Sequence, residues 1–182
     1  MKKLAFVTIM MACANFNSQA SDLALNELSH LSELQYGFDN YASVELDYAL
    51  NSNVNIIQEN NSYGQGNSAL VKQSGENNSA SIEQYGGGNI AYIHQYGSGN
   101  AAYVSEYGYS NYGVIKQYGN NNEATIIQEG GNHQGEITQY NDDNKALVVQ
   151  KSNVEYFKTD ITQSGGQTHV IINGMNKNIT IR

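Results

Sequence analysis

Glutamine recurs through most of this 182-residue chain at a fixed interval of 11 residues. The interval is kept from Gln73 to Gln150 with one exception, position 106, which holds Glu106. Two further glutamines continue the series at slightly longer intervals. The nine glutamines are Gln58, Gln73, Gln84, Gln95, Gln117, Gln128, Gln139, Gln150 and Gln163. With Glu106 they mark ten half-units of an internal repeat.

Other residue types keep fixed offsets from these glutamines. Two residues before each of the ten positions stands a β-branched aliphatic: Ile56, Val71, Ile82, Ile93, Val104, Ile115, Ile126, Ile137, Val148 and Ile161. Six residues before most of them stands asparagine: Asn67, Asn78, Asn89, Asn100, Asn111, Asn122 and Asn144. Two residues after comes glycine: Gly75, Gly86, Gly97, Gly108, Gly119 and Gly130. Since alanine or glycine usually lies four residues before, the unit is Asn-x-Ala-x-(Ile/Val)-x-Gln-x-Gly-x-x.

These offsets predict one strand and one turn in each unit. Side chains on a strand alternate between its faces, so the Asn, Ala, Ile/Val and Gln positions all point the same way. The glycine and its polar neighbours are turn formers. Two units then make one 22-residue rung, and rungs that stack place alternate strands in two parallel sheets. The predicted fold is all-β, a β-solenoid of about five strand-turn-strand rungs.

The composition fits a stack and excludes an ordinary core. Asn, Gln, Gly and Tyr supply 71 of the 182 residues, as 25 Asn, 14 Gln, 18 Gly and 14 Tyr, while proline is absent. Proline lacks the N–H that a β ladder needs. Stacked Asn and Gln are expected to form amide ladders around a narrow aliphatic centre. Five tyrosines, expected to form a row beside the turns, are Tyr85, Tyr96, Tyr107, Tyr118 and Tyr140.

The predicted solenoid has open ends, and no helical cap is evident in the sequence after the repeats. An unprotected sheet edge is a template for another copy. We therefore expect the stack to grow into a cross-β amyloid fibre. Glu106 in a glutamine position and Asp142-Asp143 in a turn are expected to moderate premature assembly.

The first 20 residues have the layout of a secretory signal peptide. Lys2 and Lys3 precede an apolar stretch, and cleavage is expected after Ala20. The only cysteine, Cys13, lies inside this leader, where a lipoprotein site is the alternative. Cleavage after Ala20 would leave a chain without cysteine, which excludes disulfides and thiolate sites from the mature protein.

The repeat resembles that of the curlins, the subunits of the bacterial curli amyloid fibre. The family pattern Gln-x-Gly-x-x-Asn-x-Ala-x-x-x-Gln is present from Gln84 to Gln95 and from Gln117 to Gln128, and the resemblance covers about residues 51–163. It implies export, passage through a dedicated outer-membrane channel with accessory proteins, and nucleated assembly into adhesive, biofilm-forming fibres. The implied partners are further copies, a major curlin and the outer-membrane surface.

The charge distribution favours the minor, nucleating curlin, with the major subunit as the alternative. Residues 21–50 carry a charge of -6, residues 51–143 one of -7 and residues 144–182 one of +3, which sum to -10 after leader removal. The cations of the basic end are Lys145, Lys151, Lys158, Lys177 and Arg182. They would attach the chain to an anionic membrane surface or only keep an irregular last rung soluble.

Residues 21–50 and 164–182 flank the repeats. In the family the first segment directs secretion, and we expect it to be mostly disordered. Asn40, Ala42 and Val44 nevertheless follow the repeat, with Leu46 in the glutamine position, which allows a degenerate extra strand. The C-terminal extension has strand character, as either a sixth rung or a mobile segment.

No catalytic, cofactor or metal site is predicted. His30, His94, His133 and His169 form no common motif, and the acidic balance argues against nucleic-acid binding. Two function classes remain. One is a self-assembling structural subunit, and the other is a monomeric β-solenoid that serves as a surface adhesin or ligand-binding module.

Overall fold

The computed structural model describes residues 3–10, 40–60, 65–153, 156–174 and 179–181. All regular structure in these residues is β. The strands are β1 (Lys3–Met10), β2 (Tyr41–Leu50), β3 (Asn53–Asn60), β4 (Ser68–Glu76), β5 (Ser79–Gly87), β6 (Ile90–Ser98), β7 (Ala101–Tyr109), β8 (Tyr112–Tyr118), β9 (Glu123–Gly131), β10 (Gln134–Tyr140), β11 (Lys145–Ser152), β12 (Lys158–Ser164), β13 (Thr168–Asn173) and β14 (Ile179–Ile181). The described part of the chain holds no helix with the length and apolarity to cross a membrane.

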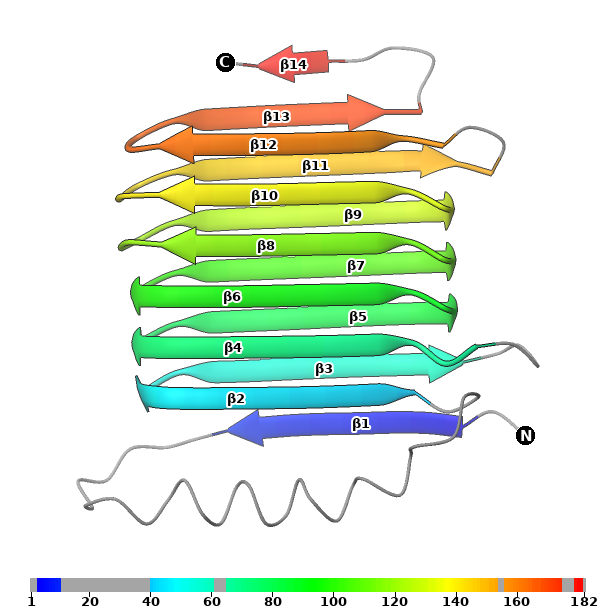
Figure 1. Ribbon diagram of the computed structural model, residues 1–182, viewed down its shortest axis with the longest axis horizontal. Coiled ribbons are helices and arrows are strands. Elements are labelled where there is room, and N and C mark those ends of the chain that lie inside the picture. Colours follow the sequence, from blue (N-terminus) through cyan, green and yellow to red (C-terminus); the bar gives the residue numbers. More distant parts are fainter. Residues whose placement is uncertain (1–2, 11–39, 61–64, 154–155, 175–178, 182) are drawn as a thin grey trace.

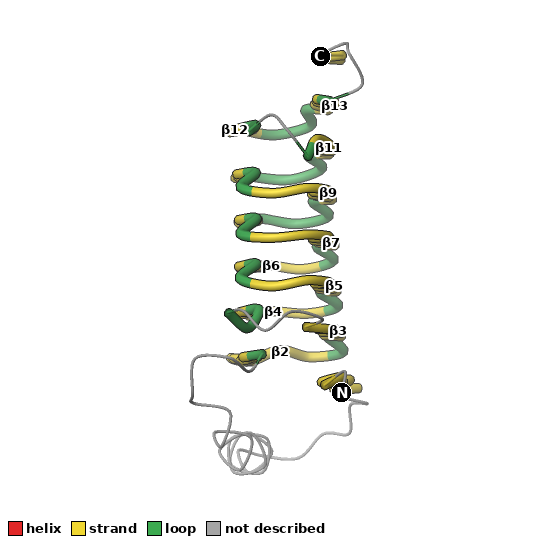
Figure 2. Tube along the Cα trace, turned by 90° about the vertical axis from the view of Figure 1, so that its right-hand side faces the viewer, coloured by secondary structure: helices red, strands yellow, loops and turns green. Residues whose placement is uncertain are grey.

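The strands form two facing sheets, and the chain alternates between them (Figure 1). One sheet has the order β1-β3-β5-β7-β9-β11-β13-β14, and the other has the order β12-β10-β8-β6-β4-β2. Figure 2 shows the successive turns stacked along one axis. Neighbouring strands from β2 to β13 are parallel within each sheet. The all-β solenoid of about five repeat rungs predicted from the 11-residue period is therefore confirmed.

The register places like residues on one another. Along β6, Ile93 lies between Val71 and Ile115, and Gln95 lies between Gln73 and Gln117. The same alignment recurs in the other sheet, where Glu106 lies between Gln84 and Gln128. A shift by one residue would turn every inward side chain outward, so the buried face fixes this register.

The stack extends beyond the repeats in both directions. Strand β2 brings Val44 onto Val71 and Leu46 onto Gln73, and β13 continues the eight-stranded sheet after β11. That sheet ends in antiparallel strands, β1 beside β3 and β14 beside β13. Most of the predicted signal peptide and most of residues 21–50 lie outside the described residues, so those assignments stay predictions.

The core is a narrow column of small and β-branched side chains. All ten aliphatic repeat positions are at most 3% exposed, and Ala69, Ala80, Ala91, Ala102, Ala124 and Ala146 pack beside them. The strands show the period-two burial of a sheet with one covered face. Glutamine and asparagine of the repeat are buried in the same column, which leaves the aliphatic groups dry.

The turn glycines meet a backbone requirement that other residues cannot meet. All six predicted positions have φ between 107° and 136°. A Cβ at Gly97 would lie 2.0 Å from the carbonyl oxygen of Gly119, which is the equivalent glycine one rung away. The rungs therefore approach so closely at this turn that no side chain fits.

The substitution Gly97→Ala is expected to destabilise the stack through both φ strain and this clash, by about 1–3 kcal/mol or more. The measurement is the urea concentration that removes half of the β-sheet signal in far-ultraviolet circular dichroism. Gly166→Ala is the matched control, because Gly166 also has positive φ, +64°, but a Cβ there would meet nothing within 4 Å. Equal losses in the two variants would contradict the steric account.

Candidate functional site: the stacking core

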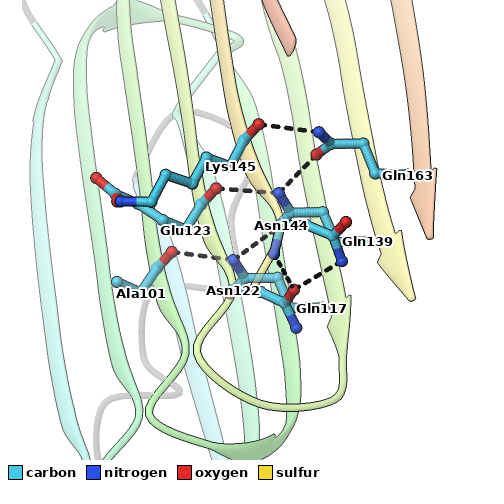
Figure 3. Close-up of polar contacts among 8 residues, drawn as sticks. All are labelled: Ala101, Gln117, Asn122, Glu123, Gln139, Asn144, Lys145 and Gln163. Atoms are coloured by element: carbon cyan, nitrogen blue, oxygen red, sulfur yellow. Dashed lines mark hydrogen bonds and ion pairs between the residues drawn. The ribbon is translucent and has the colours of Figure 1, made fainter. Parts of the chain in front are cut away.

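The glutamine ladder joins neighbouring rungs through side-chain amides. In each sheet the Nε2 of one glutamine donates to Oε1 of the next, at 2.7–2.9 Å, as from Gln95 to Gln117 and from Gln128 to Gln150. Figure 3 shows this chain of bonds from Gln117 through Gln139 to Gln163. The donor of every such bond lies nearer the N-terminus, so the ladder has a direction.

The same Nε2 group also holds the two sheets together. Its second hydrogen goes to a backbone carbonyl of the opposite sheet, from Gln117 to Ala101 at 3.0 Å and from Gln139 to Glu123 at 3.0 Å (Figure 3). Equivalent bonds leave the other ladder glutamines at 2.9–3.2 Å. Each amide therefore uses both donors, which meets the cost of burying it.

The asparagine ladder runs in the opposite direction along the other margin of the core. Asn122 donates from its backbone N–H and from Nδ2 to Oδ1 of Asn100. Asn144 donates to Oδ1 of Asn122 in the same way, as Figure 3 shows. The Nδ2 groups also reach carbonyls of the turn glycines, as from Asn100 to Gly119 at 2.8 Å. Asparagine thus fixes the turns, whereas glutamine joins the sheets.

Glu106 occupies one glutamine position and is completely buried. Its Oε2 accepts a hydrogen bond of 2.7 Å from Nε2 of Gln84. Burial raises the pKa of this carboxyl well above its ordinary value of 4.5, and the hydrogen bond from Gln84 lowers it only in part.

His133 occupies the asparagine position of β10, a role that the sequence analysis missed. It lies 11 residues from both Asn122 and Asn144, and its backbone N–H bonds Oδ1 of Asn111 as an asparagine's would. The buried ring stacks on Phe157, with centroids 5.4 Å apart. Its Nε2 faces two carbonyl oxygens, and its Nδ1 accepts from the N–H of Phe157, which assigns the proton to Nε2.

The five predicted tyrosines divide between the two sheets. Tyr118 and Tyr140 stack at 5.6 Å with an interplanar angle of 14°, and Tyr85 and Tyr107 are tilted at 6.4 Å. Tyr96 lies in the same sheet as Tyr118 and Tyr140, and its side chain is exposed. His94 points outward and meets the hydroxyl of Tyr118 at 3.3 Å. Burial lowers the pKa of His94, and the Lys72 charge lowers it further.

Two cations of the predicted basic end form ion pairs within the stack. Lys145 contacts Glu123 at 3.0 Å, and Lys151 contacts Glu129 at 2.6 Å, each one rung away. Lys158 is exposed on β12, while Lys177 and Arg182 lie outside the described residues. The charge that this end offers to a partner is therefore smaller than the sequence count of +3 indicates.

The described residues hold no group of three or more His, Cys, Asp or Glu side chains able to bind a metal ion. In the part of the chain that the structure describes, the buried side-chain polar atoms bond to one another or to the backbone, except one oxygen each of Gln73, Glu106 and Gln128. The arrangement is suited to holding copies of one strand in register.

Replacing His133 with alanine would leave the carbonyls of Glu129 and Ser152 without this donor, and we expect a cost of about 1–3 kcal/mol. His94→Ala, on the outer face, should cost less. The readout is the urea midpoint of the β-sheet signal for both variants. Equal midpoints would show that His133 has no special role in the asparagine column.

The family model for the curlin associated repeat matches residues 63–86, 75–105, 107–130 and 119–151. No curated protein and no solved structure matches the chain. The matched residues contain most of β4–β11. The strands of this core thus match the curlin associated repeat, and the matches support the curlin family for this chain.

Proposed function

We propose that this protein is a secreted, self-assembling structural subunit of curli fimbriae. The observation that carries the proposal is the in-register parallel stack of like residues, with inward amides that bond from one rung to the next. Within the described residues, β2 and β12 are the terminal strands of the six-stranded sheet, and each pairs on one side only. Such edges accept a further strand.

The two edges fit one another in a head-to-tail join. If β12 of one copy pairs with β2 of the next in the observed register, Ile161 lies on Val44 and Gln163 on Leu46. The eight-stranded sheet needs more change. Cleavage of the predicted leader after Ala20 removes β1 and uncovers β3, and β14 has to leave β13. A head-to-tail contact of this kind does not close, and it produces a filament.

Within the curli system we assign the chain to the minor subunit, which nucleates the major curlin at the outer cell surface and so supports adhesion and biofilm formation. The charge difference between the acidic body and the basic end supports this assignment. Leu46 and Glu106 replace glutamine, and His133 replaces asparagine, in the two ladders. Such departures from a uniform ladder also suit a subunit that is present in few copies. The alternatives are a major curlin subunit and a monomeric β-solenoid adhesin.

The export route is part of the proposal. Residues 1–20 direct secretion, residues 21–50 engage the outer-membrane channel, and the folded chain remains at the cell surface as part of a fimbria. Its partners are further copies, a major curlin, the secretion machinery and the outer-membrane surface, to which the C-terminal cations attach it. The proposal includes no enzymatic activity and no cofactor.

The assembly test uses the chain without residues 1–20 at micromolar concentration. We expect a lag followed by thioflavin-positive fibres with a cross-β reflection at about 4.7–4.8 Å. A chain that stays monomeric would favour the adhesin alternative. Seeding then separates the subunit types, because a surface-bound nucleator at sub-stoichiometric amount should abolish the lag of a major curlin. No effect on that lag would favour the major subunit.

A charge at Gln95 is expected to slow assembly, because Gln95 is fully buried and joins three neighbours. Gln95→Lys should lengthen the thioflavin lag about tenfold or more, since a buried unpaired charge costs several kcal/mol. His94→Glu, one residue away on the outer face between Lys72 and Lys116, is the control for a charge outside the core and should not lengthen the lag. A longer lag for the His94 variant than for the Gln95 variant would mean that the fibre core contains the other face of β6.

A further inference from the structure

Two of the buried polar atoms without a hydrogen-bond partner lie at one place in the core. They are Oε1 of Glu106 on β7 and Oε1 of Gln128 on β9. These residues are direct neighbours in the glutamine ladder. Elsewhere in the ladder an amide Nε2 fills this place and donates to the next glutamine, as from Gln95 to Gln117 at 2.9 Å. Here two oxygens face the same gap.

The strand opposite leaves room for the carboxyl. Gly113 on β8 stands where most units have alanine, and a Cβ there would lie 3.1 Å from Oε1 of Glu106 and 3.5 Å from Oε1 of Gln128. It would also lie 2.8 Å from a methyl group of Val104. Both oxygens without partners therefore surround one point, and no side chain from Gly113 separates them.

We infer that Glu106 is a protonation switch inside the ladder. As a neutral acid its O–H donates to Oε1 of Gln128, so the column from Gln58 to Gln150 is continuous. As a carboxylate it has no hydrogen to donate, and its charge faces the oxygen of Gln128. The ionised side chain therefore interrupts the ladder in the middle of the eight-stranded sheet.

The surroundings supply no charge that would stabilise the carboxylate. Strands β5, β9 and β8 pack against β7. Their inward residues are Ala80, Ile82, Gln84, Ala124, Ile126, Gln128, Gly113, Ile115 and Gln117, none of which is titratable. The charged and titratable groups on the other face or at the ends of these strands are Glu83, Tyr85, Tyr112, Lys116, Tyr118, Glu123 and Glu129. The charged ones have outer partners, namely Tyr103, Glu136, Lys145 and Lys151.

The direction of the pH effect follows from the raised pKa of Glu106. The stacked form binds the proton more tightly than the unfolded chain, so acid favours stacking. The stabilisation of the stack by protonated Glu106 is fully present below the ordinary glutamate pKa of 4.5. It is lost as the pH rises through the pKa that Glu106 has in the stacked form. The effect belongs to a single chain, and it holds whether or not copies join into a fibre.

The test compares the full chain with Glu106→Gln, which restores the repeat with a side chain of the same shape. The urea midpoint of the β-sheet signal is measured from about pH 4 to pH 8. The stability of the wild type relative to this variant should fall with rising pH, by up to about tenfold in the folding equilibrium constant for each pH unit. A constant difference between the two chains across this range would overturn the inference.

The matched control is Glu76→Gln, which removes the same charge from an exposed position on β4. It reports how the smaller net repulsion alone changes with pH, because the whole chain carries a formal charge of -8. This variant should follow the wild-type pH profile. If Glu76→Gln flattens the profile as much as Glu106→Gln does, general repulsion explains the effect and the switch is wrong.

A spectroscopic readout of the wild type keeps the inference independent of how stable the variants are. In chains with isotope-labelled glutamate, infrared difference spectra separate the C=O band of a neutral acid from the bands of carboxylates. We expect one acid band to persist well above the pH at which exposed glutamates ionise, and Glu106→Gln to lack it. Absence of that band from the stacked wild type would show an ionised Glu106 and overturn the inference.

Discussion

The structure depends on the buried amide, which is stable only when all its hydrogen-bond partners are present. Each ladder glutamine needs a like residue on the next strand and a carbonyl of the opposite sheet, as Gln117 finds in Gln139 and Ala101. A bonded amide contributes about 0.5–1.5 kcal/mol net, whereas a buried group left unbonded costs about 1–3 kcal/mol. That asymmetry favours repetition of one residue type, because most replacements leave partners unsatisfied in both directions.

The aliphatic column and the amide ladders complement each other. One Ile or Val for each strand makes a core too thin for an ordinary domain, but in the parallel register Ile93 contacts equivalents on both sides and is completely buried. Parallel sheets are usually covered, and here each sheet covers the inner face of the other. The glutamines close the margins of this column, so few large side chains are enough to exclude water.

The length of the repeat and the covered face of each strand were predictable from the sequence, because both depend only on the spacing of residues along the chain. The 11-residue interval and the period of two place Ile126 and Gln128 on the covered face, where the structure has them. The second donor of each glutamine was not predictable, since it depends on how the two sheets are offset. The role of His133 was not predicted, because histidine replaces the asparagine that marks this position in the other units. The antiparallel strand β14 depends on a reversal that no repeat signal encodes.

The opposite directions of the two ladders make the ends of the stack chemically different. Glutamine donors point towards the C-terminal end, as from Gln139 to Gln163, whereas asparagine donors point towards the N-terminal end, as from Asn89 to Asn67. A stack of uniform repeat units would therefore offer glutamine donors with asparagine acceptors at one end and the complement at the other, although in this chain Leu46 takes the glutamine position on β2. Two like ends would oppose donor to donor and acceptor to acceptor. Unlike ends of such a uniform stack match in both columns at once, so the directions of the two ladders favour head-to-tail growth.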